Sequence, residues 1–511
     1  MGEPIDLANA GLLDLRAALG NGDITSRELV RACIERIEAL DRAGPLLRSI
    51  IELNPDADSI SARLDEERRD GRLRGPLHGI PVLLKDSVDT ADEMMTTAGS
   101  LALVGQAPYR DATVAARLRA AGAILLGKAN MSEWANIRSE RSSSGWCGRN
   151  GQSRNPHVLD RSPSGSSSGS AVAVAAGLVP FAIGTETDGS IISPASANGI
   201  VGLKPTVGLV SRAGVVPISR SQDAVGPLVR TVTDAALVLG AIAGPDPRDS
   251  ATGESRGRLL ESYLGVLDAD GLRGARIGVA RNIGFGASPK TDRVMEEVIA
   301  ALRDAGAEVI DPAAIRSDVG EAGRFEMEVL LYELKEALNA YLSLRRGVAL
   351  DREGFESTLS GIIAFNEAHS DAELRHFGQE LLVKAAEKGP LSEEAFLDAL
   401  EASRRLSGRE GIDRTLEELE LDALIAPSGG PARPIDLVNG DGDGFGSSGP
   451  SARAGYPIVS VPAGFVSALP VNVSFIGRAF DEPRLLKLAF AFEQATRARR
   501  APAFLTSLPL E

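Results

Sequence analysis

The chain has 511 residues, and its 55 Lys and Arg against 70 Asp and Glu give a formal net charge of −15. This acidic balance argues against nucleic-acid-binding proteins and polybasic membrane-surface proteins, because both classes depend on clustered basic residues. Hydrophobic residues make up 43% of the chain, which is enough for a large buried core and excludes general disorder.

Cysteine and histidine are both scarce in this chain. Two cysteines, Cys33 and Cys147, exclude a disulfide framework and a cysteine-rich zinc module. Four histidines, with no His-Glu-x-x-His pair among them, offer little material for a metal site. We therefore expect neither a metal ion nor a cofactor.

The N-terminal segment and the apolar runs bear on location. Residues 1–20 have no basic region ahead of an apolar run, so no signal peptide is predicted. This favours a cytoplasmic protein, or a periplasmic or secreted one if a leader has been removed. The apolar run over 171–184 is broken by Gly177 and Pro180, so we interpret it as a buried core segment. We expect no membrane or nucleic-acid partner, and the oligomeric state is left open.

Short apolar runs alternate with amphipathic stretches along the first half of the chain. In chain order, the spacing predicts helices within 5–70, a strand over 79–84, a helix over 112–121, a strand over 123–127, a helix over 171–178 and a strand over 179–184. Residues 139–170 are rich in Ser, Gly, Asn and Arg, and long loops of this kind in compact domains tend to be functional.

The second half continues this alternation around one long helical stretch. In chain order, it predicts strands over 276–282 and 307–311 around a helix over 290–304, a helical excursion over 315–420, a strand over 422–428, a loop over 429–450, two closing strands and a helix over 482–498. The strand-helix-strand order is typical of an α/β fold.

Lys85 directly follows the apolar run Val82-Leu83-Leu84. A lone lysine at the end of a strand usually extends to water. A buried lysine instead loses solvation, which favours its neutral form and makes it a candidate general base.

The segment 162–171, SPSGSSSGSA, is a serine-rich loop that leads directly into the predicted apolar helix. A flexible linker is the simplest interpretation, but the helix ties this loop to the core. Gly165 to Gly169 also match the G-x-S-x-G pattern of α/β-hydrolases, with Ser167 at its centre. The strand that should precede that pattern is missing.

The segment 184–195, GTETDGSIISPA, follows a predicted strand and contains Ser190 behind Asp188-Gly189. Consecutive backbone N–H groups of Thr187, Asp188, Gly189 and Ser190 could point at one oxygen atom, as in an oxyanion hole. A tight turn without chemistry is the alternative interpretation.

Taken together, LLKD, SGSSSGSA and GTETDGS, followed by GLKPTVGLVSRAGVVP, resemble the amidase signature family. The match is dense over 75–245 and resumes at DALIAPS, YPIVSVPAGF and LPVNVSFIGRAFDE. The TETDGSI, NMSEWAN and GLVSR segments are most similar to bacterial peptide amidases. The family uses a Ser-cis-Ser-Lys triad, so the resemblance implies Ser190 as nucleophile, Ser166 as bridging serine and Lys85 as base.

The resemblance also implies the fold and the reaction. We expect an α/β fold with a mixed, largely parallel central sheet flanked by helices, as a single domain over 1–511 in which 315–420 caps the substrate cleft. The expected reaction is hydrolysis of a carboxylic amide, most of all the C-terminal amide of a peptide, through an acyl-enzyme. A small-molecule or peptide amide is therefore the expected binding partner.

Three positions depart from the common family pattern. Asp188 stands where many members have glycine, Ile192 where many have arginine, and Ser474 where glutamine is common. These changes argue against small acidic amides and favour a neutral, more apolar substrate. We expect Ile191 and Ile192 to contact it, while the role of Asp188 stays open.

Three alternatives remain at this point. One is a broad amidase or esterase of the same family that acts on aryl or fatty amides. Another is an α/β-hydrolase with Ser167 and either His369 or His376. The third is a non-catalytic subunit that binds a partner through the acidic helical region.

Overall fold

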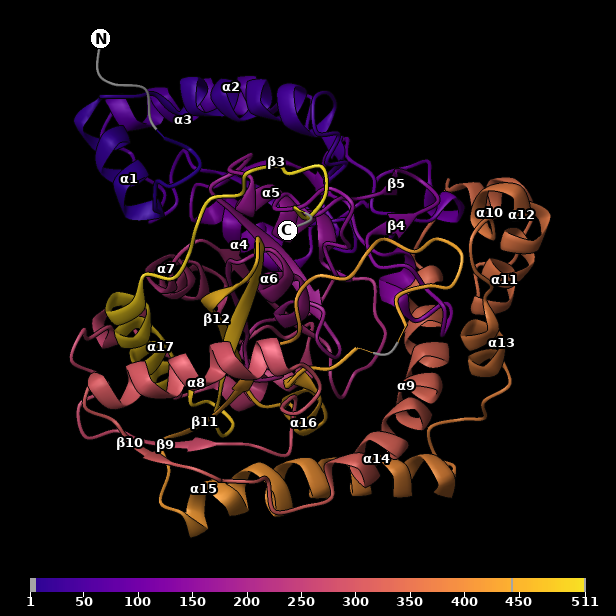
Figure 1. Cartoon of the computed structure of the whole chain (residues 1–511). Helices are drawn as coiled ribbons and strands as arrows, with labels where there is room; N and C mark the ends of the chain where they lie inside the picture. Colours follow the sequence, from indigo (N-terminus) through magenta and orange to yellow (C-terminus); the bar gives the residue numbers. More distant parts are fainter. Residues whose placement is uncertain (1–5, 443, 510–511) are drawn as a thin grey trace.

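An eleven-stranded sheet lies at the centre of the part of the chain that the computed structural model describes, residues 6–442 and 444–509 (Figure 1). Its strand order is β1-β3-β2-β6-β8-β7-β12-β13-β11-β9-β10, and β4 and β5 form a separate hairpin. The strands are β1 (Ile50–Leu53), β2 (Pro81–Lys85), β3 (Ile124–Ala129), β4 (Trp146–Cys147), β5 (Gly151–Gln152), β6 (Phe181–Glu186), β7 (Val201–Lys204), β8 (Ala224–Val229), β9 (Arg276–Val279), β10 (Glu308–Ile310), β11 (Ala423–Pro427), β12 (Ile458–Val466) and β13 (Leu469–Ile476).

The strand pairings confirm a mixed sheet flanked by helices, with less parallel pairing than expected. Over the described residues, β2 is parallel to β3 and β6, and β9 is parallel to β10 and β11. The other six pairings of the sheet are antiparallel. The predicted parallel character therefore holds only locally, and Lys85 lies at the end of one of the parallel strands.

The helices divide into an N-terminal group, the layers on the sheet and a long excursion. They are α1 (Leu12–Asn21), α2 (Ser26–Arg36), α3 (Ala57–Arg69), α4 (Thr113–Ala120), α5 (Ser168–Ala175), α6 (Ile192–Ala197), α7 (Val232–Ile242), α8 (Pro289–Asp304), α9 (Val319–Leu342), α10 (Ala349–Arg352), α11 (Leu359–Ala368), α12 (Ser370–Glu373), α13 (Glu380–Ala386), α14 (Glu394–Ser407), α15 (Arg414–Glu418), α16 (Ser448–Ala454) and α17 (Glu482–Thr496). Short 3₁₀ or π turns are η1 (Ile37–Asp41), η2 (Leu101–Leu103), η3 (Glu133–Asn136), η4 (Ser250–Ser255), η5 (Tyr263–Val266) and η6 (Gly408–Asp413).

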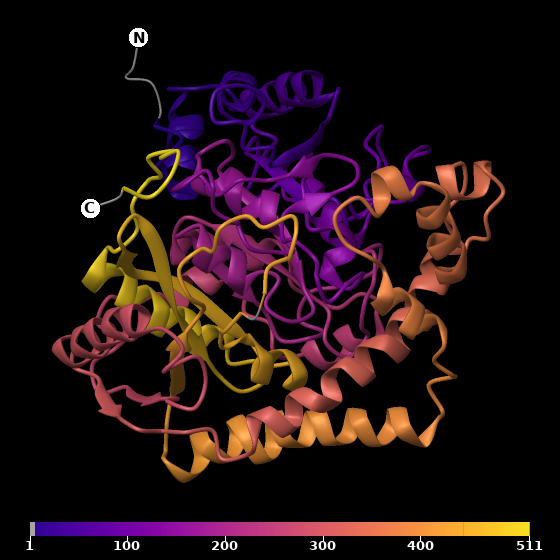
Figure 2. The same ribbon diagram turned by 45° about the vertical axis from the view of Figure 1, so that its right-hand side comes forward.

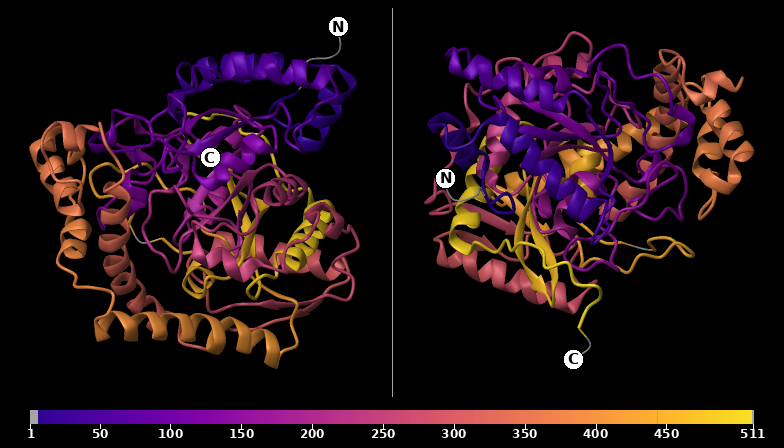
Figure 3. Two further views of the ribbon diagram at one scale, coloured as in Figure 1. Left: turned by 180° about the vertical axis from the view of Figure 1, so that it is seen from behind. Right: turned by 90° about the horizontal axis from the view of Figure 1, so that it is seen from above.

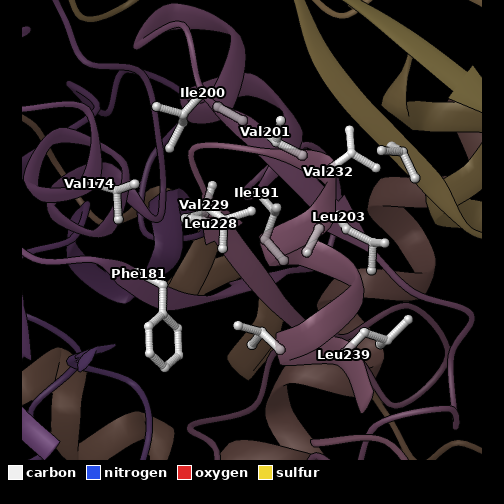
Figure 4. Packing of buried hydrophobic residues seen from close by; sticks show 14 of the residues in the cluster. Val174, Phe181, Ile191, Ile200, Val201, Leu203, Leu228, Val229, Val232 and Leu239 are labelled. Carbon is white, nitrogen blue, oxygen red and sulfur yellow. The ribbon is translucent and has the colours of Figure 1, made fainter. Parts of the chain in front are cut away.

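Local sequence explains several of these elements. Helix α8 begins at Pro289 after Ser288, whose hydroxyl accepts a hydrogen bond from Thr291 N, as expected for an N-cap followed by proline. Strand β2 is buried along its whole length, as expected for a continuous apolar run covered on both faces. Helix α5 contacts β6, while α6 contacts β7, β12 and β13, and Figure 4 shows buried side chains of this region.

Helices α9 to α15 form the excursion between β10 and β11. They run along one side and the lower edge of the molecule in Figure 1 and stay outside the sheet in Figures 2 and 3. Helix α9 packs against α14, and α13 packs against α9.

The excursion is joined to the core by a buried charged seam of Glu133, Arg138 and Glu373, whose side chains have no exposed surface. The Arg138 guanidinium contacts Glu133 and lies 3.7 Å from Glu373. Glu373 Oε1 also accepts hydrogen bonds from Leu101 N at 2.6 Å and Ser100 Oγ at 3.2 Å. Burial and the neighbouring Glu373 carboxylate raise the pKa of Glu133 well above its ordinary value.

Candidate active site

Lys85 is the last residue of β2 and has no exposed surface. Its Nζ donates hydrogen bonds to Ser166 Oγ at 2.7 Å and to the carbonyl of Thr185 at 3.0 Å. Burial lowers the pKa of this amine from 10.5 to about 7, while the carboxylates of Asp223 and Glu186 oppose that shift. A large share of Lys85 is therefore neutral near pH 7.

Ser166 lies in the serine-rich loop that precedes α5 and is fully buried. The Gly165–Ser166 peptide bond is cis, in agreement with the Ser-cis-Ser-Lys pattern of the family that the sequence resembles. A Cβ on Gly165 would lie 2.2 Å from Ser132 Oγ, so this position accepts only glycine without rearrangement. The carbonyl of Ser166 accepts a hydrogen bond from Ser132 N at 3.1 Å.

Ser190 lies between β6 and α6 and is 7% exposed. Its carbonyl accepts a hydrogen bond from Ser167 N at 3.1 Å, so the loops that carry Ser190 and Ser166 are directly joined. Glu186 Oε2 accepts hydrogen bonds from Ile191 N at 2.7 Å and Ile192 N at 3.0 Å. These contacts fix the turn on which Ser190 is presented.

The backbone ahead of Ser190 has donors available for an anion. Gly189 has φ +74°, and a Cβ there would come within 3.0 Å of both Ser193 Oγ and Ser448 Oγ. Across residues 6–442 and 444–509, the N–H groups of Asp188, Gly189 and Ser190 meet no protein acceptor. The arrangement leaves these groups able to donate to a substrate oxygen.

The structure places Ile191 and Ile192 differently from the sequence-based expectation. Both side chains have no exposed surface and belong to the hydrophobic core, and Figure 4 shows Ile191 among core side chains. Ile191 lies against Gly202 and Gly226 of the neighbouring strands. The first turn of α6 therefore faces the sheet, and neither side chain is among those that line the two hollows next to the Ser190 loop.

Two hollows flank the loops that carry Ser166 and Ser190. The first is mainly apolar and is lined by Ser87, Trp134, Ile137, Thr185, Thr187, Ile218, Asp223 and Leu334, among others. The second is more polar and is lined by Arg161, Ser164, Ser193, Lys290, Gly429, Gly430, Asp441 and Phe445, among others. The loop over 429–450, which had no assigned role, thus lines the second hollow; its residue 443 lies outside the described residues.

Sequence reasoning missed two further buried lysines at strand ends or near them. Lys128 on β3 donates to the carbonyl of Val88 at 2.6 Å and to Thr96 Oγ1 at 2.8 Å. Lys204 ends β7 and donates to the carbonyl of Pro205 at 3.1 Å. Lys204 belongs to the segment GLKP, which the sequence identifies only as a family motif. The sequence alone does not show whether this lysine is buried or exposed.

The arrangement predicted for an α/β-hydrolase is not formed. Ser167 Oγ donates to the carbonyl of Thr185 at 3.1 Å, and no histidine ring of the described chain contacts this serine. His369 Nδ1 lies 2.9 Å from the carbonyl of Phe365, and His376 packs edge-on against Trp146. Both histidines belong to the helical excursion.

The described residues offer neither a metal cluster nor a membrane-spanning helix. They contain no group of three or more His, Cys, Asp or Glu side chains arranged to hold a metal ion. Among the helices that the structure describes, none combines the length and the apolar character needed to cross a membrane.

With this geometry in place, the family can be assigned. Residues 28–486 match the model of the family described as Amidase, so the chain belongs to the amidase family. A probable amidase of Arabidopsis thaliana is 42% identical over 508 residues, which cover 98% of this chain and 92% of that protein. A glutamyl-tRNA(Gln) amidotransferase subunit of Chloroflexus aurantiacus is 38% identical over 490 residues, covering 94% of this chain and 95% of that protein.

Solved structures are similar over nearly the whole chain. The native peptide amidase from Stenotrophomonas maltophilia is 50% identical with a TM-score of 0.91, covering 98% of this chain and 100% of that one. The peptide amidase PAM in complex with the competitive inhibitor chymostatin is 50% identical with a TM-score of 0.92 and the same coverage. The protein is thus an amidase of the amidase signature fold, so neither an α/β-hydrolase nor a non-catalytic protein remains as an alternative.

Proposed function

We propose that this amidase hydrolyses the C-terminal amide of peptides and releases ammonia, with Ser190 as nucleophile, Ser166 as proton relay and Lys85 as base. The observation that carries this proposal is the 2.7 Å hydrogen bond between the buried Lys85 Nζ and Ser166 Oγ. A pKa lowered to about 7 supplies the neutral amine that a base requires.

In the first step, Ser190 Oγ attacks the amide carbon while its proton passes to Ser166 Oγ and the Ser166 proton passes to Lys85 Nζ. The carbonyl oxygen becomes negative and accepts hydrogen bonds from the backbone N–H groups of residues 187–190. The C–N bond then breaks as the same relay returns a proton to the nitrogen, which leaves as ammonia. Water hydrolyses the resulting ester by the reverse sequence and restores Ser190.

A peptide substrate is supported by relatives and by the shape of the site. Two of the similar structures are peptide amidases, one of them in complex with chymostatin. The second hollow reaches Ser193, three residues after Ser190, and is lined by serines and backbone glycines that can hydrogen-bond a peptide chain. The apolar lining of the first hollow favours a second candidate, an aryl- or fatty-amide amidase.

We also propose that the excursion over 315–420 closes one side of the substrate cleft. Leu334 of α9 lines the first hollow together with Thr187, next to the Ser190 loop. Leu334→Trp should therefore raise KM for amides with bulky acyl groups at least about fivefold more than KM for small ones. An equal change for both classes would contradict this role of the excursion.

The main test combines labelling with a substrate panel. A fluorophosphonate should label Ser190, and Ser190→Ala should lower ammonia release more than about a thousandfold, because the covalent step is lost. Ser170→Ala serves as the matched control, since the hydroxyl of this buried serine on α5 donates to the carbonyl of Ile183 at 3.2 Å. The control should keep most of the activity.

The panel should contain an N-blocked dipeptide amide, an aryl amide, a fatty amide and free asparagine. The highest kcat/KM for the dipeptide amide would support peptide amide hydrolysis. The highest value for the aryl or fatty amide would replace it with the second candidate. Label on a residue other than Ser190 would overturn the mechanism.

A further inference from the structure

Thr187 begins the proposed oxyanion loop. The side chains of two consecutive residues, Gln222 and Asp223, form hydrogen bonds with it. Asp223 Oδ1 accepts a hydrogen bond from Thr187 Oγ1 at 2.6 Å. Gln222 Nε2 donates to the carbonyl of Thr187 at 3.3 Å. The other carboxylate oxygen of Asp223 accepts from Ile218 N and Ser219 N, both at 2.9 Å, so its own loop holds the carboxylate in place.

Helix α9 of the excursion forms hydrogen bonds with Gln222 and with the neighbouring Ser221. Glu326 Oε1 accepts a hydrogen bond from the same Gln222 Nε2 at 2.8 Å, and Glu326 Oε2 accepts from Arg453 Nη1 at 2.9 Å. Seven residues further along the same helix, Glu333 Oε2 accepts from Ser221 N at 3.1 Å and from Ser221 Oγ at 2.8 Å. Residues seven apart share one helix face, so α9 docks along the loop over 218–223.

The electrostatics indicate that Glu326 lies close to the Ser190 loop. After burial itself, the largest influence that raises the pKa of Glu326, to about 7, is the negative charge of Asp188. Asp188 immediately follows Thr187 and is exposed. A continuous set of contacts therefore runs from α9 through Gln222 to the residues directly ahead of Ser190.

We propose that Gln222 and Asp223 are positioning residues that hold the oxyanion loop through Thr187, and that α9 holds Gln222 through Glu326. This inference rests on the proposed function, because it assumes that the backbone N–H groups after Thr187 stabilise the transition state. Gln222 lines neither hollow, and the Asp223 carboxylate, which lines the first hollow, is already bonded to Thr187 and to its own loop. An oxyanion hole works only if its donors are fixed in advance, and a displacement of about 1 Å can cost about a hundredfold in rate.

The first test compares Thr187→Val with Thr187→Ser. Valine keeps the shape of threonine but removes the hydroxyl that bonds Asp223, whereas serine retains that hydroxyl. We expect Thr187→Val to lower kcat about 10- to 100-fold with KM changed less than about threefold, because only transition-state binding is affected. Fluorophosphonate labelling of Ser190 should slow by the same factor, and Thr187→Ser should keep at least about half of kcat.

The second test addresses the contribution of α9. Gln222→Leu should lower kcat about tenfold, and Glu326→Gln should lower it less, because an amide oxygen can still accept from Gln222. The double variant should be no slower than Gln222→Leu alone, since residues that act through one contact are not additive. Tyr332→Phe is the matched control on α9: its hydroxyl bonds Glu393 at 2.5 Å, away from the loop over 218–223.

Each result supports or overturns the proposal. An unchanged kcat in Thr187→Val or in Gln222→Leu, with only a lower Tm, would show that these contacts merely stabilise the fold. An increase in KM at constant kcat would show substrate contact instead of positioning. Additive losses of kcat in the double variant would show that α9 does not act through Gln222. Failure to label Ser190 in the unmodified protein would overturn the proposed function itself, which distinguishes the two.

Discussion

The carboxyl ends of β2 and β7 each carry a lysine with no exposed surface, Lys85 and Lys204, yet the two ends differ in what the amine meets. Lys85 faces the Ser166 hydroxyl, and burial lowers its pKa to about 7. Lys204 faces the carbonyl of Pro205, and burial lowers its pKa to about 8 against the opposing carboxylates of Glu186 and Glu482.

Burial therefore lowers the pKa of a lysine but does not by itself make that lysine a base in a relay. A hydroxyl can accept one proton while it gives up another, whereas a peptide carbonyl has no proton to give. Of these two strand ends, only that of β2 offers this exchange. We therefore expect the strand end at Lys204 to contribute to stability and the strand end at Lys85 to contribute to turnover.

The largest expected effect is at Lys85. Lys85→Ala should lower kcat more than about a thousandfold, and Lys85→Arg should not restore it, because arginine stays protonated at any working pH. Lys204→Met should keep kcat within about tenfold when rates are normalised to the fraction labelled at Ser190. Comparable losses at both lysines would show that the two strand ends do not differ in the way described.

The pH dependence of kcat/KM should distinguish Lys85 from Lys204. Protonated Lys85 cannot accept a proton, so activity should be low below its pKa, rise about tenfold per pH unit, and level off above about 7. The profile is measured with ammonia release at substrate concentrations below KM. A midpoint near pH 8 that disappears in Lys204→Met would show that Lys204, and not Lys85, controls the pH dependence.

A smaller effect is expected on stability. Lys204→Met removes a cation that interacts with the buried carboxylates of Glu186 and Glu482, which should lower the free energy of unfolding by about 2 to 4 kcal/mol. Urea unfolding at pH 7, below the pKa of about 8 at which Lys204 loses its charge, measures the change. A stability equal to that of the unmodified protein would show that these charges are not coupled.

The smallest effect should come from the histidines. A variant with His369→Gln and His376→Gln should keep kcat within about twofold, because both rings lie in the excursion and neither contacts the relay. Steady-state ammonia release is sufficient to measure this. A large loss with normal labelling of Ser190 would reinstate a histidine as base, and the contrast between the lysines would lose its meaning.

Much of the fold could be predicted because its signals are local. The helix predicted over 290–304 is α8, Pro289–Asp304, and the strand predicted over 79–84 is β2, Pro81–Lys85. A cap, a proline and an apolar run decide these elements within a few residues. The antiparallel pairing of β6 with β8 could not be predicted, since it depends on partners about 40 residues apart in the chain.

The candidate site was predictable only in part, for the same reason. The family motifs name Lys85, Ser166 and Ser190, and two of these three meet in a hydrogen bond. The inward direction of Ile191 and Ile192 depends on the phase of α6, which is set by contacts with the sheet. The hydrogen bond between Thr187 and Asp223 joins residues 36 positions apart, and nothing in either segment alone indicates it.

The buried charged seam of Glu133, Arg138 and Glu373 limits how the excursion could be exchanged between relatives. A graft that brought in the helices of 315–420 with an apolar side chain at 373 would leave Ser100 Oγ and Leu101 N without their acceptor. Such unpaired buried donors cost about 1 to 3 kcal/mol each. The excursion and the segments around residues 100 and 133–138 therefore depend on one another structurally. A chimaeric enzyme with new specificity should transfer all of them together.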